Sequence, residues 1–167
     1  KDHRVFSNYG VILKNYGKLQ QAESSFRKAI ELKPDLAESH YNLGIILKDL
    51  GKSKDAEFYL RKAIELNPEF ALAHFAFGNI LRDLGKSKDA ELSYRKSIEF
   101  KPAFAQAHYN LGNTLQDLNN LKDAESSYRK AIQINPNLVE AHSNLGNVLK
   151  DLNNFKEAES SYRKAIQ

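Results

Sequence analysis

The sequence predicts an all-α protein, a solenoid of antiparallel helix pairs that stack along the chain. Prolines recur every 34 residues, at Pro34, Pro68, Pro102 and Pro136. A fixed period of roughly 20–50 residues is the signature of a stacked repeat architecture. Glycines recur on the same period, at Gly10, Gly44, Gly78, Gly112 and Gly146. Residues 105–133 and 139–167 are also identical at 22 of 29 aligned positions.

This period divides the chain into five repeats, which we expect to form one array over residues 1–167. The repeats are 3–36, 37–70, 71–104, 105–138 and 139–167, the last of them incomplete. Because each repeat buries its open face on the next one, we expect Tyr162 and Ile166 of the last repeat to be partly exposed. The chain starts at Lys1 and contains no methionine, so we expect it to be a fragment or a processed piece of a longer protein.

The first helix of each repeat is predicted by apolar and small residues at intervals of three and four. In the fourth repeat they are Ala107, His108, Leu111, Gly112, Leu115 and Leu118. Such spacing places them on one face of an α-helix. The helix is expected to end at Asn119 and Asn120, where earlier repeats have Gly17, Gly51 and Gly85. Glycine and asparagine favour the left-handed conformation that terminates many helices.

The second helix of each repeat has its own apolar face. In the fourth repeat this face contains Ala124, Tyr128, Ala131 and Ile132. The helix is expected to end near Asn135 and Pro136, because proline has no amide donor and restricts the residue before it. Alanines recur at this helix in every repeat, at Ala22, Ala56, Ala90, Ala124 and Ala158, and let the paired helices approach closely.

Composition excludes several kinds of site. The chain has no cysteine, which excludes disulfides, thiolate metal ligands and cysteine nucleophiles. No apolar run approaches the roughly 18 residues of a membrane span, and no signal peptide is recognisable. No glycine-rich phosphate loop or nucleophile elbow occurs, and the carboxylates recur in every repeat. We therefore expect no enzyme activity in this chain, no cofactor, no metal and no membrane insertion, and we expect a cytoplasmic location.

Taken together, these residues resemble the tetratricopeptide repeat family. The resemblance rests on the 34-residue period, the Leu–Gly pair, the two alanines, the closing proline and the aromatic at Phe26, Tyr94, Tyr128 and Tyr162. The stretches A-H-Y-N-L-G-N and S-Y-R-K-A-I are most similar to the superhelical arrays of O-linked N-acetylglucosamine transferases and related bacterial proteins. The resemblance implies a right-handed superhelix whose first helices line a concave groove.

The chain departs from the family pattern at two positions. The tryptophan that the family has in the first helix is replaced by Phe6, His40, His74, His108 and His142. An apolar residue of the second helix is replaced by Glu23, Glu57, Glu91, Glu125 and Glu159. Neither departure is expected to change the fold.

The recurring histidines and basic pairs each have a structural and a functional interpretation. Histidines one repeat apart are separated by a helix-packing distance of roughly 8–10 Å, too far to share a zinc ion. Because they occupy the position where the family has a buried aromatic residue, the resemblance implies that they are buried in the stack. The arginines of the basic pairs at 27–28, 61–62, 95–96, 129–130 and 163–164 each follow a glutamate by four residues. That order favours an ion pair on the helix surface, so we expect a solvated face and no nucleic-acid partner.

Positions expected to face the groove differ between repeats. Tyr41, Phe75 and Tyr109 place aromatic rings in the three central repeats, whereas Ser7 and Ser143 occupy the two ends. We expect an apolar pocket around Phe75, with Lys48 and Arg82 further along the groove. In the alternative interpretation, the rings only pack against neighbouring first helices.

Asparagines form two columns on the same face. Asn8, Asn42, Asn110 and Asn144 make one column, interrupted at Ala76, and Asn79, Asn113 and Asn147 make the other. An asparagine offers a donor and an acceptor, so such a column can match the amides of an extended peptide. By resemblance to the transferase-type arrays, this column would grip a peptide backbone. Alternatively, the asparagines bridge adjacent first helices or cap loop carbonyls.

An outer-face contact is the other candidate site. Phe58, Tyr59 and Leu92 stand on second helices where most repeats have serine. An exposed apolar strip there would suit a second copy or a flanking domain. Scattered surface residues are the alternative interpretation.

The sequence thus favours a non-enzymatic module that binds a protein or peptide ligand in extended form. Two alternatives stay open, namely a substrate-recruiting arm of a larger glycosyl- or sulfotransferase, and a homo-oligomer formed through the array ends or the outer-face contact. A clamp for a C-terminal carboxylate, another binding mode of the family, is not expected. It needs a lysine at the position of Ser7, Tyr41, Phe75, Tyr109 and Ser143.

Overall fold

The computed structural model describes residues 2–166, and this part of the chain contains ten α-helices and no strand. The chain divides into two compact units, residues 1–80 and 81–167, with the boundary inside α5 (Ala71–Asp83). Within each unit, the helices of each pair pack against each other and neighbouring pairs are in contact, which confirms the predicted all-α stack of helix pairs.

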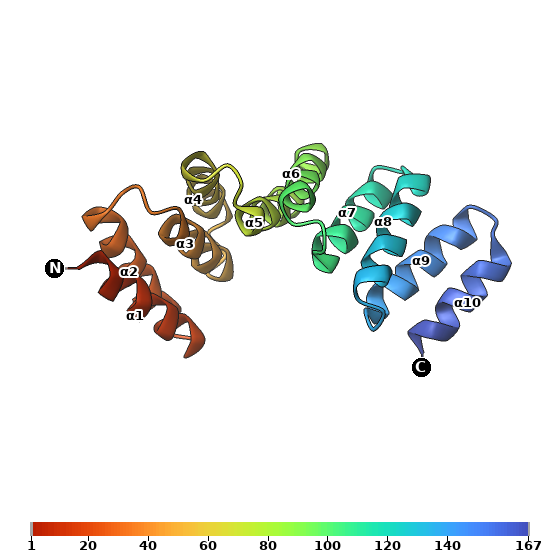
Figure 1. Ribbon diagram of the computed structural model, residues 1–167, viewed down its shortest axis with the longest axis horizontal. Helices are drawn as coiled ribbons and strands as arrows, with labels where there is room; N and C mark the ends of the chain where they lie inside the picture. The colour runs from red at the N-terminus through yellow and green to blue at the C-terminus, as the bar shows by residue number, and fades with distance from the viewer. Residues whose placement is uncertain (1, 167) are drawn as a thin grey trace. The chain divides into compact units, whose positions relative to one another are not determined.

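The first unit contains four complete helices and most of α5. They are α1 (His3–Asn15), α2 (Leu19–Leu32), α3 (Ala37–Asp49) and α4 (Ser53–Leu66). The pairs α1/α2 and α3/α4 run antiparallel, and α2 also packs against α3 (Figure 1).

The second unit repeats this arrangement. It contains α6 (Ser87–Phe100), α7 (Ala105–Asp117), α8 (Leu121–Ile134), α9 (Val139–Asp151) and α10 (Phe155–Ala165). The pairs are α7/α8 and α9/α10, while α6 packs against α7 and α8 against α9 (Figure 1). At the end of α10, Tyr162 is half-buried and Ile166 is 84% exposed, as predicted.

The turn inside each pair depends on one left-handed residue. The φ angle is positive at Gly17, Gly51, Gly85, Asn119 and Asn153, which confirms the predicted helix ends. After α7, the amide of Asn119 donates to the carbonyl of Gln116 at 2.9 Å, and the amide of Asn120 donates to that of Leu115 at 2.8 Å. These two bonds satisfy carbonyls that the end of the helix leaves without partners.

Paired helices touch at the glycine in the middle of each first helix. A Cβ atom on Gly112 would lie 2.6 Å from Cε1 of Tyr128, and one on Gly44 would lie 2.7 Å from Cγ of Leu60. Tyr128, Leu60 and the alanine Ala124 are fully buried. The absence of a side chain at the glycine therefore makes room for a large buried residue of the second helix.

Successive repeats are joined by a hydrogen bond between a histidine and a proline carbonyl. Nε2 of each buried histidine lies 2.8–2.9 Å from this carbonyl oxygen, in the pairs His40–Pro34, His74–Pro68, His108–Pro102 and His142–Pro136. A carbonyl can only accept, so Nε2 carries the proton and Nδ1 of the neutral ring is an acceptor. The histidines are buried, as predicted, and they tie each first helix to the turn before it.

The outer surface carries the ion pairs that the sequence predicts. Each glutamate–arginine pair is formed, with nitrogen–oxygen distances between 2.7 and 3.0 Å, in Glu23–Arg27, Glu57–Arg61, Glu91–Arg95, Glu125–Arg129 and Glu159–Arg163. Exposed pairs of this kind contribute only about 0–1 kcal/mol each. Their main effect is therefore to orient the arginines.

Replacing Gly112 by alanine is expected to lower the free energy of unfolding by about 1–3 kcal/mol, because the new methyl group would overlap the Tyr128 ring. The sign is informative, since the same change in an open helix interior stabilises by roughly 0.5–1 kcal/mol. Chemical denaturation measures the effect, with Ser126→Ala on the exposed side of α8 as control. A stabilised Gly112→Ala variant would contradict the close approach of α7 and α8.

Acidification is expected to weaken the fold through His108. Burial lowers the pKa of His108 below its ordinary value of 6.5, and the positive charge on Lys130 lowers the pKa further. The hydrogen bond to the Pro102 carbonyl raises the pKa but does not cancel these effects. Just below pH 6.5 the unfolded chain therefore binds more protons than the folded chain, and stability falls as the pH falls.

Urea denaturation at about pH 7 and about pH 5 tests this linkage. The His108→Gln variant, which has no titrating ring at that position, should lose less stability between the two conditions than the unchanged protein. Equal losses in both proteins would show that His108 does not supply the pH dependence.

Candidate functional site

The predicted groove residues all lie on first helices, and they divide between the two units. Asn8, Tyr41, Asn42, Lys48, Phe75 and Asn79 belong to the first unit, and Arg82, Tyr109, Asn110, Asn113, Asn144 and Asn147 belong to the second. α1 contacts α3 in the first unit, and α7 contacts α9 in the second. Adjacent first helices therefore form a surface within each unit.

In the second unit, this surface holds a network of hydrogen bonds centred on Asn113. Nδ2 of Asn144 donates to Oδ1 of Asn113 at 2.9 Å and to the Tyr109 hydroxyl at 3.3 Å. The Tyr128 hydroxyl donates to the same Oδ1 at 2.7 Å. Oε1 of Gln116 lies 2.9 Å from the Tyr128 hydroxyl oxygen. The amide oxygen of Asn113 thus accepts two hydrogen bonds.

The amide nitrogens of Asn113 and Asn147 remain available as donors. The Tyr162 hydroxyl donates to Oδ1 of Asn147 at 2.8 Å, as Tyr128 does to Asn113 one repeat earlier. Within residues 2–166, neither Nδ2 group has a hydrogen-bond partner, and both side chains are half-buried. Each oxygen is held by a tyrosine, so each amide has a set orientation with its N–H groups unused.

Asn110 has a different environment from Asn113. It is buried, with 7% exposure, and its Oδ1 accepts from Nε2 of Gln106 at 3.3 Å. It also hydrogen-bonds the hydroxyl of Tyr94, whose pKa burial raises to about 12. The two asparagine columns therefore differ, since Asn110 and Asn144 bond to neighbouring side chains while Asn113 and Asn147 keep unused donors.

Burial of a neighbouring tyrosine supports this picture. Burial raises the pKa of the Tyr128 hydroxyl above its ordinary value, as do the nearby Tyr109 and Asp117, whereas the polar side chain of Asn144 opposes the shift. Tyr128 therefore stays a neutral hydroxyl, which can donate to Asn113. The Tyr109 ring lies 6.0 Å from the Tyr128 ring, centroid to centroid, and is half-buried beside the network.

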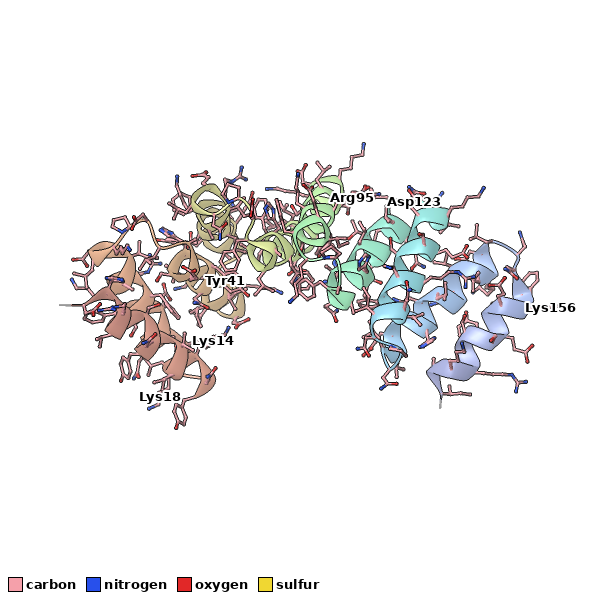
Figure 2. The ribbon with its side chains drawn as sticks, in the orientation of Figure 1. Lys14, Lys18, Tyr41, Arg95, Asp123 and Lys156 are labelled. Carbon is pink, nitrogen blue, oxygen red and sulfur yellow. The ribbon has the colours of Figure 1, made fainter. Side chains whose placement is uncertain are left out.

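The first unit has a different set of contacts at the equivalent positions. Tyr41 of α3 (Figure 2) is half-buried, its ring centroid lies 5.0 Å from that of Phe70, and burial raises the pKa of its hydroxyl. The hydroxyl oxygens of Ser7 and Ser39 lie 3.3 Å apart and link α1 to α3. Among the other predicted residues of this unit, Asn8 is exposed. The half-buried ones are Asn42, Lys48, Phe75 and Asn79. Arg82, in the second unit, is also half-buried.

The tyrosine anchors were missed from the sequence, although a signal for them exists. Where the first helix has Asn113 or Asn147, the second helix has Tyr128 or Tyr162. Where the first helix has Val11 or Ile45 at that position, the second helix has Phe26 or Leu60. An asparagine on the first helix thus occurs with a tyrosine on the second, and an apolar residue occurs with another apolar residue. Two side chains in contact need this match, because a buried polar group needs a hydrogen-bond partner.

The three residues proposed for an outer-face contact differ in their exposure to solvent. Phe58 in the first unit and Leu92 in the second are 54% and 64% exposed. Tyr59 is half-buried within its own unit, because its ring stacks on His40 with a centroid distance of 5.9 Å. A contact through Phe58 or Leu92 stays a prediction.

The structure also bears on two other kinds of site. None of the helices within residues 2–166 has the length and apolar character needed to cross a bilayer. The same residues contain no cluster of three or more histidine, cysteine, aspartate or glutamate side chains that could hold a metal ion.

Comparison with protein families identifies a repeat in most of the chain. A model described as tetratricopeptide repeat matches residues 37–70, 105–138 and 139–167, and a second model of that description matches residues 59–91. A model described as TPR repeat matches residues 10–51 and 78–119. A comparison with curated protein sequences found no significant match.

Solved structures with the same fold include several repeat proteins. MamA from Desulfovibrio magneticus RS-1 is 22% identical with a TM-score of 0.89, over 98% of this chain and 93% of that one. PilF from Pseudomonas aeruginosa is 20% identical with a TM-score of 0.90, over 99% and 75%. YrrB, described as a TPR protein with an unusual peptide-binding site, is 23% identical with a TM-score of 0.83, over 96% and 83%. At these identities the likeness concerns the fold alone.

Removing the Tyr128 hydroxyl is expected to weaken the network at Asn113. Tyr128→Phe should lower the free energy of unfolding by about 0.5–1.5 kcal/mol, the usual contribution of one hydrogen bond. A double-mutant cycle with Asn144→Ala measures the coupling, which should be about 0.5 kcal/mol or more because both residues bond to Asn113. Strictly additive effects would contradict a shared network.

Proposed function

The chain belongs to the tetratricopeptide repeat family, and we propose that it is a protein-interaction module that binds an extended polypeptide along its first helices. Two kinds of observation support this function. The repeat models that match the chain belong to a family of generally non-enzymatic scaffolds. A protein of similar fold, YrrB, is described as having a peptide-binding site.

The observation that carries the proposal is the pair of unused amide donors on α7 and α9. Asn113 and Asn147 are one repeat apart, and a tyrosine hydroxyl holds each oxygen. Packed helices lie roughly 8–10 Å apart, which equals about three residues of an extended chain at about 3.3 Å each. Donors at this spacing can reach carbonyls about three residues apart in one extended peptide.

This mode of binding is independent of the peptide's side chains, because every residue has a carbonyl group. Selectivity would come from the residues around the donors. In the second unit, Tyr109 offers an apolar ring beside Asn113. The first unit, taken by itself, offers the half-buried rings of Tyr41 and Phe75 on its first helices. Lys48 and Asp49 occur together there, which favours a ligand of mixed or neutral charge.

Changing Asn113 and Asn147 together to aspartate tests the donors directly. Aspartate keeps an oxygen for the tyrosine hydroxyl but has no N–H group, and its charge repels a peptide carbonyl. Loss of two hydrogen bonds, at about 0.5–1.5 kcal/mol each, should weaken peptide binding about tenfold or more. Fluorescence anisotropy with a labelled peptide selected from a random library measures the affinity.

The double variant Asn135→Asp, Asn137→Asp, in the exposed turn between α8 and α9, is the matched control, because it adds the same two negative charges away from Asn113 and Asn147. The control should bind the peptide as the unchanged protein does. If the Asn113→Asp, Asn147→Asp protein remains folded by circular dichroism and binds the peptide with unchanged affinity, the two amides do not contact the ligand.

A further inference from the structure

The second helices of the second unit enclose a cleft that the peptide-binding face does not use. It lies between α6 and α8, and a buried residue of α7 forms part of its lining. Its volume is about 590 Å³, within the roughly 300–1,000 Å³ that is usual for ligand pockets. Arg95 of α6, His108 of α7 and Ser127 of α8 all line it; Figure 2 marks Arg95.

The first unit shows which group fits at this position in a repeat. Tyr59 stands two periods before Ser127, on α4. Its ring stacks on the buried His40 at a centroid distance of 5.9 Å and an interplanar angle of 30°. Nη1 of Arg27 donates to the Tyr59 hydroxyl at 2.9 Å, and the guanidinium carbon lies 5.5 Å from the ring centroid. Stacking, a cation–π contact and a charge-assisted hydrogen bond therefore hold one phenol ring.

The cleft in the second unit has the same partners without the ring. Arg27 and His40 correspond to Arg95 and His108, each two periods later. Ser127 takes the position of Tyr59, and a hydroxymethyl group leaves the space of a phenol empty. His108 is buried and, like His40, donates a hydrogen bond from Nε2 to a proline carbonyl.

The two arginines are also oriented by the same bonds. Arg27 contacts Glu23 through Nε and Nη2, which leaves Nη1 for the Tyr59 hydroxyl. Arg95 contacts Glu91 through Nε and Nη2, both at 2.8 Å. Nη1 of Arg95 has no hydrogen-bond partner within residues 2–166. A donor is thus held ready at the place where Arg27 meets a hydroxyl.

We propose that the cleft between α6 and α8 binds a tyrosine side chain of a partner polypeptide. The ring stacks on His108, and its hydroxyl accepts a hydrogen bond from Nη1 of Arg95, as Tyr59 does with its partners in the first unit. Charge in the lining supports an oxygen acceptor, since Arg129 and Lys130 accompany a single carboxylate, Glu99. Gln133 stands where the second repeat has Glu65, which removes one negative charge.

A related cleft one repeat later provides an internal comparison. It is lined by Arg129, His142 and Ser161, and its volume is about 300 Å³. Arg129 bonds to both Glu125 and Glu157, so it is less free to turn to a ligand than Arg95. We expect the cleft over His108 to bind a tyrosine side chain more tightly than the cleft over His142.

Titration with N-acetyl-tyrosinamide, followed by NMR, tests the site. Saturable shifts are expected for the His108 ring and the Ser127 amide. N-acetyl-phenylalaninamide should bind roughly tenfold more weakly, because it lacks the hydroxyl that a charged donor binds. Absence of saturable shifts at His108, or equal affinity for the two compounds, would overturn the proposal.

Two serine variants locate the site. Ser127→Tyr should fill the cleft from within, abolish the shifts and raise Tm, whereas Ser161→Tyr should leave binding at His108 unchanged. Binding to a folded Ser127→Tyr protein as tight as to the unchanged protein would overturn the proposal. The Asn113→Asp, Asn147→Asp protein should bind N-acetyl-tyrosinamide normally, so failure at this cleft and failure of the peptide-binding face can be told apart.

The converse change creates the site elsewhere. Tyr59→Ser should open a cleft over His40, lower Tm and add saturable N-acetyl-tyrosinamide shifts at His40. The added compound should also restore part of the lost Tm, because it binds the folded state. A folded Tyr59→Ser protein that shows no binding at His40 would refute the idea that Tyr59 marks what the cleft accepts.

Discussion

The close approach of the paired helices at the central glycine is the constraint on which the other features depend. At Gly112 nothing separates the backbone of α7 from the Tyr128 ring, so the ring is fully buried between the helices. Its position places the hydroxyl 2.7 Å from Oδ1 of Asn113 on the first helix. The close packing at Gly112 thereby positions the Asn113 side chain for binding. Any side chain on the glycine would move the Tyr128 ring and, with it, the hydroxyl that holds Asn113.

A second constraint acts between repeats. The buried histidine donates to the proline carbonyl before its own helix, which fixes the turn and the tautomer of the ring. The histidine ring then forms the floor of the space between two successive second helices, such as the cleft between α6 and α8. Whether that floor is covered depends on one residue, since Tyr59 covers it in the first unit and Ser127 leaves it open in the second. The repeated frame thus stays constant while single substitutions decide where a ligand can enter.

The sequence by itself determined the repeat, the helices and their ends, and the surface ion pairs. These features depend on residues three or four positions apart or on equivalent positions one period apart, and both patterns are visible in a linear chain. The resemblance to a known family placed the histidines in the stack. The resemblance of the repeat to a known family added the expectation of a peptide ligand.

Only the tertiary structure decided which atoms remain free to bind. The two asparagine columns differ because of hydrogen bonds between residues far apart in the sequence. The Tyr128 hydroxyl, 15 positions from Asn113, donates to the oxygen of Asn113. The amide nitrogen of Asn144 donates to the hydroxyl of Tyr109, 35 positions earlier. Tyr59 looked like an exposed apolar residue in the sequence, and its role depends on Arg27, 32 positions earlier. Such contacts arise where helices from different repeats meet, because a linear pattern records which residues share a face but not which of their atoms are already paired.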